Sequence, residues 1–207
     1  MFDDYKEWTA FQETAGGLPA NIFGYIAMNL VKLFAIKDTR NPAAIAPQLP
    51  HGKHLEPDTI PTRSAERPQI SRWPVPQRVR EAILIPTDDE YAAFTQRLET
   101  WLTKQREAGN NVVKGKAFDS LDAYFLGKHE LFHIHPVDKS LHCMLDTSDA
   151  KLLVEKGWAE WFGIAGRVGQ KPGTVLVYAP RSTEEMDIMV RIWDAAISFA
   201  KDEGKAA

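Results

Sequence analysis

The stretch Leu131-Phe-His-Ile-His-Pro-Val-Asp-Lys-Ser-Leu-His-Cys-Met-Leu145 predicts two strands joined by a short turn. Side chains alternate between the faces of a strand, so His133 and His135 point to the same side. Pro136 cannot donate a ladder hydrogen bond, and the Asp-Lys-Ser run after it favours a reversal of the chain. The returning strand then brings His142 close to the other two histidines. We therefore expect an antiparallel hairpin that gathers three imidazole groups.

Further strands and two long helices flank this hairpin in the sequence. Thr87-Asp-Asp-Glu90 and Ser182-Thr-Glu-Glu185 fit the capping-box pattern, and amphipathic helices are expected after them, over 88–108 and 183–202. A shorter helix should begin at the Thr147-Ser-Asp149 cap and end at Gly157. Apolar runs predict strands at 80–85, 112–117, 121–126, 131–135, 141–146 and 174–178. Because the middle strands follow one another directly, we predict an α+β fold with an antiparallel β-sheet and packed amphipathic helices.

The first 78 residues differ in character from the rest of the chain. Residues 1–36 are expected to be helical, whereas residues 37–78 hold eight of the thirteen prolines and show little periodicity. Such a long segment is either disordered or laid across the surface as an arm, and Ile60, Ile70 and Trp73 favour the arm. We therefore divide the chain into an N-terminal helix with a proline-rich arm, 1–78, and an α+β catalytic domain, 79–207.

Composition narrows the class of protein. The chain has 207 residues, of which 44% are apolar and 26% charged, as in ordinary globular domains. A net charge of −3 gives no sign of a nucleic-acid or anionic-membrane partner. Cys143 is the only cysteine, which excludes an internal disulfide and a cysteine-rich zinc site. The acidic, polar start lacks the features of a secretory signal, so a cytoplasmic location is expected.

The apolar stretch 18–36 predicts one amphipathic helix. Its large apolar residues recur at helical spacing: Ile22, Phe23, Ile26, Leu30, Leu33 and Phe34. Polar interruptions such as Asn29 and Lys32 argue against a spanning helix, which needs about 20 residues with few polar ones. We expect this helix to pack on the domain, with contact between residues 18–36 and a membrane surface as the alternative.

Motifs after the hairpin resemble those of a known family. They are Gly157-Trp158, Ile164-Ala-Gly166 and Tyr178-Ala-Pro-Arg181, which follow the Leu141-His142 pair in this order. This pattern resembles the fungal luciferase family, whose luminous members oxidise 3-hydroxyhispidin with molecular oxygen. The similarity extends upstream through Arg67-Pro-Gln-Ile70 and so covers nearly the whole chain. It implies an oxygen-dependent oxidoreductase that acts on a hydroxypyrone or polyphenol, with O2 as co-substrate and without flavin, nicotinamide or haem.

Two departures from the family pattern bear on light emission. Luminous members have a longer turn with an additional histidine where this chain has Pro136-Val-Asp138. They also carry a histidine in the stretch where this chain has Trp161-Phe162. A related oxidation is therefore expected more strongly than light from the standard luciferin. Family members often have a membrane anchor before the catalytic region, so membrane association is expected if such an anchor precedes this sequence.

The residue chemistry fits oxidation of an enolisable substrate. One imidazole among His133, His135 and His142 can act as the base, because its ordinary pKa of about 6.5 lies near working pH. The motif implied by the resemblance makes Arg181 the candidate that stabilises an enolate or peroxide anion. A surface salt bridge between Arg181 and the neighbouring Glu184 or Glu185 is an equal alternative.

Other side chains are candidates for contact with the substrate. Tyr178 could donate to it, although a tyrosine on an apolar strand is more often part of the core. Trp158 and Trp161 could stack on a flat aromatic molecule, or they could anchor the core. Asp138 could orient a histidine of the hairpin, although aspartates in turns usually bond their own backbone.

Two other classes of function remain open at this point. A His-x-His pair with a third histidine across a hairpin is also a pattern for zinc or iron, so His133, His135 and His142 are alternatively metal ligands. Spacing alone does not separate this metal-dependent enzyme from a metal-free base cluster. A non-catalytic small-molecule-binding module would need only the pocket.

Overall fold

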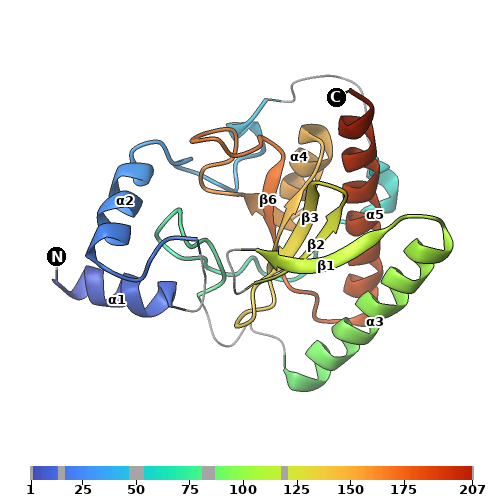
Figure 1. Cartoon of the computed structure of the whole chain (residues 1–207), viewed down its shortest axis with the longest axis horizontal. Helices are drawn as coiled ribbons and strands as arrows, with labels where there is room; N and C mark the ends of the chain where they lie inside the picture. The colour runs from blue at the N-terminus through green and yellow to red at the C-terminus, as the bar shows by residue number, and fades with distance from the viewer. Residues whose placement is uncertain (1, 14–16, 47–53, 81–86, 118–120, 207) are drawn as a thin grey trace.

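The computed structural model describes residues 2–13, 17–46, 54–80, 87–117 and 121–206. Within these residues, six strands form one antiparallel sheet in the order β1-β2-β3-β4-β6-β5. Their bounds are β1 Val112–Ala117, β2 Leu121–Leu126, β3 His129–Ile134, β4 Leu141–Met144, β5 Ala159–Trp161 and β6 Thr174–Val177. Figure 1 shows this sheet with α1 and α2 on one side and α3 and α5 on the other. The predicted α+β class with an antiparallel sheet is confirmed.

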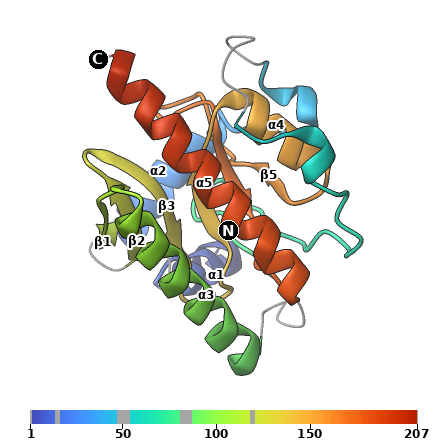
Figure 2. The same cartoon turned by 90° about the vertical axis from the view of Figure 1, so that its right-hand side faces the viewer.

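The helices are α1 Phe2–Gln12, α2 Ile22–Lys32, α3 Asp88–Glu107, α4 Thr147–Glu155 and α5 Thr183–Ala206, with 3-10 turns at Pro42–Ala44 and Pro57–Thr59. The capping box at Thr87 is present, with Glu90 bonding back to the Thr87 backbone N–H. The cap of α4 differs from the prediction, because Asp146, one residue before Thr147, accepts the N–H of Ser148 at 2.7 Å. Figure 2 shows α5 lying obliquely across one face of the sheet, with α3 and α4 on either side of it.

The main core lies between the sheet and α3 and α5. The Trp193 side chain of α5 is fully buried, and its ring centroid lies 5.5 Å from Phe132 and 5.3 Å from Trp101. Phe132 points from β3 towards these helices together with Cys143, its register partner on β4. We call this side of the sheet the helix face. Because its residues alternate with the histidines along β3 and β4, the three histidines belong to the opposite face.

The described part of the N-terminal segment contacts the chain on either side of β5, which is an edge strand of the sheet. The backbone N–H of Ile36 donates to Gly163 at 2.7 Å, and that of Arg63 donates to Lys156 at 2.8 Å. Ile70 and Val79 form an isolated antiparallel bridge. The predicted strand at 80–85 lies almost entirely outside the described residues. Among the described residues, none of the helices has the length and apolar character needed to cross a bilayer.

The packing around Trp193 gives a first prediction. Trp193→Ala should lower the free energy of unfolding by about 3–5 kcal/mol, because it empties the centre of the aromatic core. Urea titration followed by far-UV circular dichroism measures this loss. Val113 on β1 is 46% exposed, so Val113→Ala is the control and should change the value by less than about 0.5 kcal/mol. Equal effects of the two substitutions would contradict the assignment of the core.

Candidate functional site

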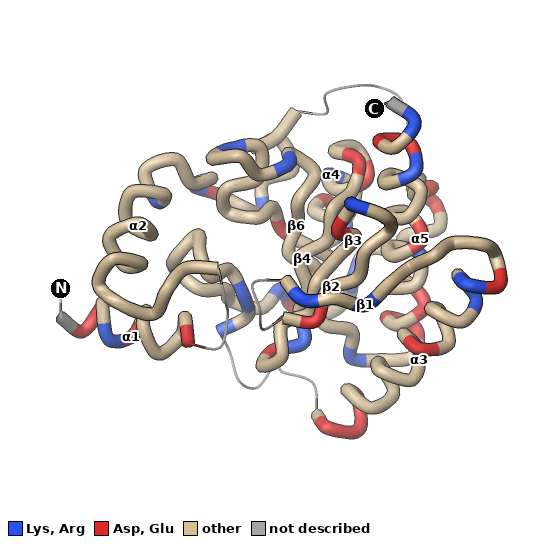
Figure 3. The backbone as a smooth tube through the Cα atoms, viewed as in Figure 1, with Lys and Arg blue, Asp and Glu red and all other residues tan. Residues whose placement is uncertain are grey.

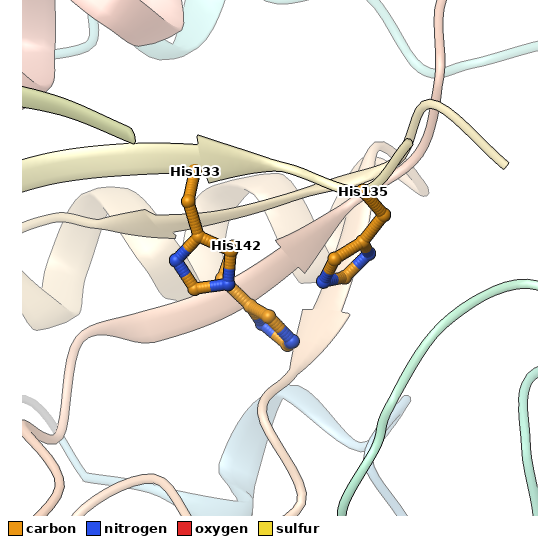
Figure 4. Close-up of side chains that lie close together, drawn as sticks. All are labelled: His133, His135 and His142. Atoms are coloured by element: carbon orange, nitrogen blue, oxygen red, sulfur yellow. The ribbon is translucent and has the colours of Figure 1, made fainter. Parts of the chain in front are cut away.

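The β3–β4 hairpin gathers the three histidines. His133 and His142 are direct partners in the antiparallel register, so both side chains leave the sheet on the same face. His135 follows β3, where its N–H donates to the Ser140 carbonyl at 2.8 Å and closes the turn. The ring centroids lie 5.2 Å (His133–His142), 5.5 Å (His133–His135) and 4.9 Å (His135–His142) apart. Figure 4 shows the rings on one side of the strands, turned towards one another.

The three imidazoles line a cavity of about 240 Å³. Phe162 lies against His142, with 4.5 Å between the ring centroids, and covers one side. Residues of the N-terminal segment and of the loop after β5 form further walls: Leu18, Val31, Val75, Pro76, Gln77 and Ile164. We call the side of the sheet that carries His133 and His142 the histidine face. The pocket on this face is mainly apolar and has a few polar atoms, which is typical of small-molecule sites.

Glu130 reaches the cluster because β3 contains a bulge. Simple alternation would place Glu130 on the face opposite His133, since the two residues are three positions apart. The register shifts between Tyr124 and Phe125, so that Leu131 has no partner on β2 and Glu130 pairs with Phe125 on the histidine face. The Glu130 carboxylate lies 2.5 Å from Nδ1 of His133. Because an ionised carboxylate only accepts, this contact favours the His133 tautomer with its proton on Nδ1.

His135 is held by a second acidic group through a serine. Its Nδ1 lies 2.9 Å from Oγ of Ser140, and that hydroxyl donates to Asp138 Oδ2 at 2.9 Å. Asp138 also accepts the backbone N–H of Val79 at 2.5 Å, and Val79 forms a bridge with Ile70, so the turn is tied to the end of the N-terminal segment. Burial raises the pKa of Asp138, while the hydrogen bond from Ser140 works in the opposite direction. Asp138 thus supports His135 through Ser140, and it is not among the residues that line the cavity.

The environment favours uncharged imidazoles at two positions. Burial, followed by repulsion from the neighbouring His142 and His133, lowers the pKa of His135 well below its usual value. Burial and the neighbouring His133 do the same to the pKa of His142. Neutral imidazoles keep a nitrogen lone pair at neutral pH. Such groups can accept a proton from a bound acid or bind a metal ion.

The nitrogen atoms are also close enough to form a metal site. One ring nitrogen from each of the three histidines can be chosen so that all lie within 4.8 Å of one another. Zinc–nitrogen bonds of ~2.0–2.1 Å in a tetrahedral site require such nitrogens to be about 3.3 Å apart. Binding would therefore require nitrogens that are now up to 4.8 Å apart to approach by as much as about 1.5 Å. The residues present therefore fit a three-histidine centre for zinc or iron.

The structure does not bring Tyr178 or Arg181 to the histidine cavity, which corrects their predicted position. Tyr178 lies just past the end of β6, where its hydroxyl donates to the buried Glu160 at 2.8 Å. Arg181 stands before α5, and its backbone N–H donates to Glu185 at 2.9 Å. Glu185 pairs with Arg63 at 3.0 Å, not with the Arg181 guanidinium as the alternative proposed.

The two candidate tryptophans also lie outside the cavity. Trp161 is fully buried on the helix face of the sheet, and its indole N–H donates to the Asn41 carbonyl at 3.0 Å. Trp158 precedes β5 and donates to the Pro61 carbonyl at 2.7 Å. Both rings anchor the described N-terminal segment, which fits the predicted alternative that they belong to the core; the structure does not bring them to the cavity.

Three residues of the site were missed by reading the sequence. Glu130 was missed because the bulge reverses its face, and a bulge leaves no clear signal in an apolar run. Ser140 was assigned only to the turn. Phe162 is adjacent to Trp161, and strand alternation could have placed it on the opposite face, but β5 itself was not predicted.

The fold and the site together define an α+β protein with a buried three-histidine cavity. Residues 128–196, which contain β3, β4, α4, β5 and β6, match the family model described as Luciferase domain. The chain is 28% identical to a luciferase of Armillaria gallica over 208 residues, which is 89% of this chain and 76% of that protein. It is 26% identical to a luciferase of Neonothopanus nambi over 212 residues, with the same two coverages of 89% and 76%. No solved structure matches the chain. The resemblance to the fungal luciferase family is thereby confirmed.

The contact between Glu130 and His133 gives a second prediction. Glu130→Ala should lower the share of the His133 tautomer protonated at Nδ1, because the acceptor that favours it is removed. Long-range nitrogen–proton NMR spectra of the histidine ring distinguish the two tautomers. Glu155→Ala is the control, since Glu155 is an exposed residue at the end of α4. An unchanged tautomer in Glu130→Ala would show that the carboxylate does not orient the ring.

Proposed function

We propose that this chain is an oxygen-dependent oxidoreductase that oxidises a hydroxypyrone of the 3-hydroxyhispidin type in the three-histidine cavity. The observation that carries the proposal is the convergence of three buried imidazoles on one mainly apolar pocket. The similarity to fungal luciferases over most of the chain supports the choice of reaction. A flat, largely apolar substrate with one acidic hydroxyl matches the lining of this pocket.

The chemistry requires a proton acceptor next to the substrate. A neutral imidazole takes the proton of the enol hydroxyl and leaves an electron-rich enolate. The enolate carbon then forms a carbon–oxygen bond with O2, which accepts the electron pair and becomes a peroxide anion. The imidazolium returns its proton to that peroxide, so the substrate and O2 combine into a hydroperoxide without loss of atoms. A positioned base typically contributes about 10²- to 10⁴-fold to such a step.

We assign the role of base to His142. It contacts both of the other rings and Phe162, and it lines the cavity. His133 and His135 have their Nδ1 atoms bonded by Glu130 and Ser140. Among the described residues, Nδ1 of His142 is a buried nitrogen without a hydrogen-bond partner. Its Nδ1 therefore lacks the side-chain partners that hold the other two rings, while backbone groups of Gln77 and Val175 contact the ring.

The assignment of the base gives a third prediction. His142→Ala should lower the rate of oxygen consumption with a 3-hydroxy-2-pyrone by about 10²- to 10⁴-fold while leaving the fold intact. An oxygen electrode measures the rate, and circular dichroism checks the fold. His129→Ala is the matched control, because His129 lies on the same strand but near Glu203 on the surface. Wild-type turnover by His142→Ala would remove this residue from the mechanism.

One observation favours a second candidate function, a metal-dependent oxidoreductase at the same three residues. The Nδ1 atoms of His133 and His135 contact Glu130 and the Ser140–Asp138 pair. Histidines that bind metals commonly donate their other ring N–H to a carboxylate or a similar acceptor, which fixes the tautomer and the ring. A metal held by these three imidazoles would polarise the enol oxygen and lower the pKa of its hydroxyl, so that water could take the proton in place of a histidine.

Removal of metal separates the two candidates and gives a fourth prediction. If His142 is the base, protein dialysed against EDTA should keep its turnover with the hydroxypyrone, and added zinc should inhibit by occupying the imidazoles. Elemental analysis and oxygen consumption before and after dialysis are the measurements. Loss of turnover on dialysis, with recovery on adding iron or zinc, would instead assign the three histidines as ligands. Binding of the hydroxypyrone without any oxygen consumption would favour a non-catalytic module.

A further inference from the structure

Helix α2 and the turn that directly follows it expose a continuous stripe of large apolar side chains, which we call the α2 stripe. Their exposed fractions range from 49% to 77%, for Ile22, Phe23, Ile26, Leu30, Leu33 and Phe34. These positions recur at helical spacing, so they share one side of the helix. The opposite side packs on the molecule, where Met28 is fully buried against Trp8. The helix thus has two apolar sides, of which one remains uncovered.

The surface of α2 differs from that of α3 and α5 in its lack of charged residues. Figure 3 shows α2 with almost no charged positions, whereas α3 and α5 carry many of both signs. Lys32 is the only charged residue of α2. Figure 1 shows the helix at the margin of the molecule, on the side away from α3 and α5. A contiguous exposed apolar surface of this kind typically marks a site that contacts a membrane or another molecule.

The loop after β5 adds to the same surface. The Arg167 side chain donates to the Phe34 carbonyl at 2.7 Å, which fixes this loop beside the C-terminal end of the stripe. The next residue, Val168, is 57% exposed and has a φ of 51°. A β-branched residue rarely adopts a positive φ, so the backbone holds an apolar side chain outward at a conformational cost.

Basic groups surround this end of the stripe. Lys37 and Arg167 line, together with Leu33 and Phe34, a groove of about 700 Å³. Asp38 lies in the same groove, where its carboxylate accepts the backbone N–H of Arg40. Lys32 is also exposed at the end of α2. The groove itself thus holds two cations and one anion, and Lys32, which also interacts with Asp4, adds a third cation beside it, although the net charge of the whole chain is −3.

We propose that the α2 stripe and Val168 dock on the surface of a phospholipid bilayer that contains anionic lipids. A helix with an apolar face and neighbouring cations lies in the plane of such an interface. The apolar side chains enter the boundary between headgroups and acyl chains. Lys32, Lys37 and Arg167 stay at the level of the phosphates, whose charge is complementary to theirs. This combination favours a lipid surface over a purely apolar protein partner.

Docking here would place the histidine cavity at the interface. Val31 of α2 and Leu18 just before it line the cavity, on the flank of the exposed stripe. An apolar substrate dissolved in the bilayer would then reach the cavity without crossing bulk water. This consequence rests on the proposed function, whereas the docking itself depends only on the surface described above.

Vesicle co-sedimentation tests the proposal on the whole chain. Wild-type protein should bind vesicles of phosphatidylcholine mixed with phosphatidylglycerol more tightly than vesicles of phosphatidylcholine alone. The double variant Phe23→Ser/Leu33→Ser should bind the mixed vesicles at least about tenfold more weakly, because two large side chains no longer enter the interface. Lys37→Gln/Arg167→Gln should lose the preference for the mixed vesicles. Val113→Ser removes an exposed valine from β1 and is the matched control, which should bind as the wild type does.

Three results would overturn the docking. The first is failure of the wild type to bind either kind of vesicle. The second is an equal loss of binding in Val113→Ser. The third is a wild-type dimer in analytical ultracentrifugation that Phe23→Ser/Leu33→Ser converts to a monomer, which would make the stripe an interface between copies. Because none of these measurements uses turnover, failure of the proposed oxidation would leave their outcome unchanged.

Discussion

The register between β3 and β4 is the constraint on which both the core and the site depend. His133 faces His142 across this pair, and Phe132 faces Cys143 on the other side of the sheet. Because side chains alternate regularly where β3 pairs with β4, a slip of one residue would send the histidines into the aromatic core and Phe132 into the cavity. The stacking of Phe132 with Trp193, at 5.5 Å between ring centroids, opposes such a slip. The aromatic core therefore sets the position of the histidines although it does not touch them.

Burial of three imidazoles and two carboxyl groups is costly unless each polar atom finds a partner. Most of these groups do so within the site: Glu130 contacts His133, and Ser140 connects His135 to Asp138. An unsatisfied buried group costs about 1–3 kcal/mol, so this network stabilises one arrangement of the rings. Asp138 also accepts the N–H of Val79, which makes the position of the N-terminal segment part of the same network.

Reading the sequence was sufficient for features that depend on local pattern. The hairpin, the antiparallel sheet and the capping box at Thr87 follow from alternation, turn residues and side-chain caps. The bulge at Leu131 depends on long-range packing, so the approach of Glu130 to His133 could not be predicted from the spacing. β5 has only three residues and reads as part of a loop. The histidine cluster was therefore predictable, and the groups that orient it were not.

The motif residues taken from the family resemblance lie in a different place from the one expected. Trp158 and Trp161 donate to backbone carbonyls of the N-terminal segment, at Pro61 and Asn41. Tyr178 and Thr39 both bond the buried Glu160, which joins the sheet to that segment again. These motif residues therefore attach the N-terminal segment to the rest of the fold. The proposed chemistry depends instead on the residues that line the histidine cavity.

The N-terminal segment connects the exposed stripe of α2 to the cavity. α1 and α2 share a small core of Trp8, Met28 and Trp73, separate from the main one. The indole N–H of Trp8 donates to the Val75 carbonyl at 3.0 Å, and Val75 with the following Pro76 forms part of the cavity wall. A displacement of α1 and α2 as a unit would therefore move that wall relative to the histidines on the sheet. His133 and His142 stand on the sheet, which α3 and α5 support from its other face, so such a displacement would act on the Val75–Pro76 wall more directly than on these two rings.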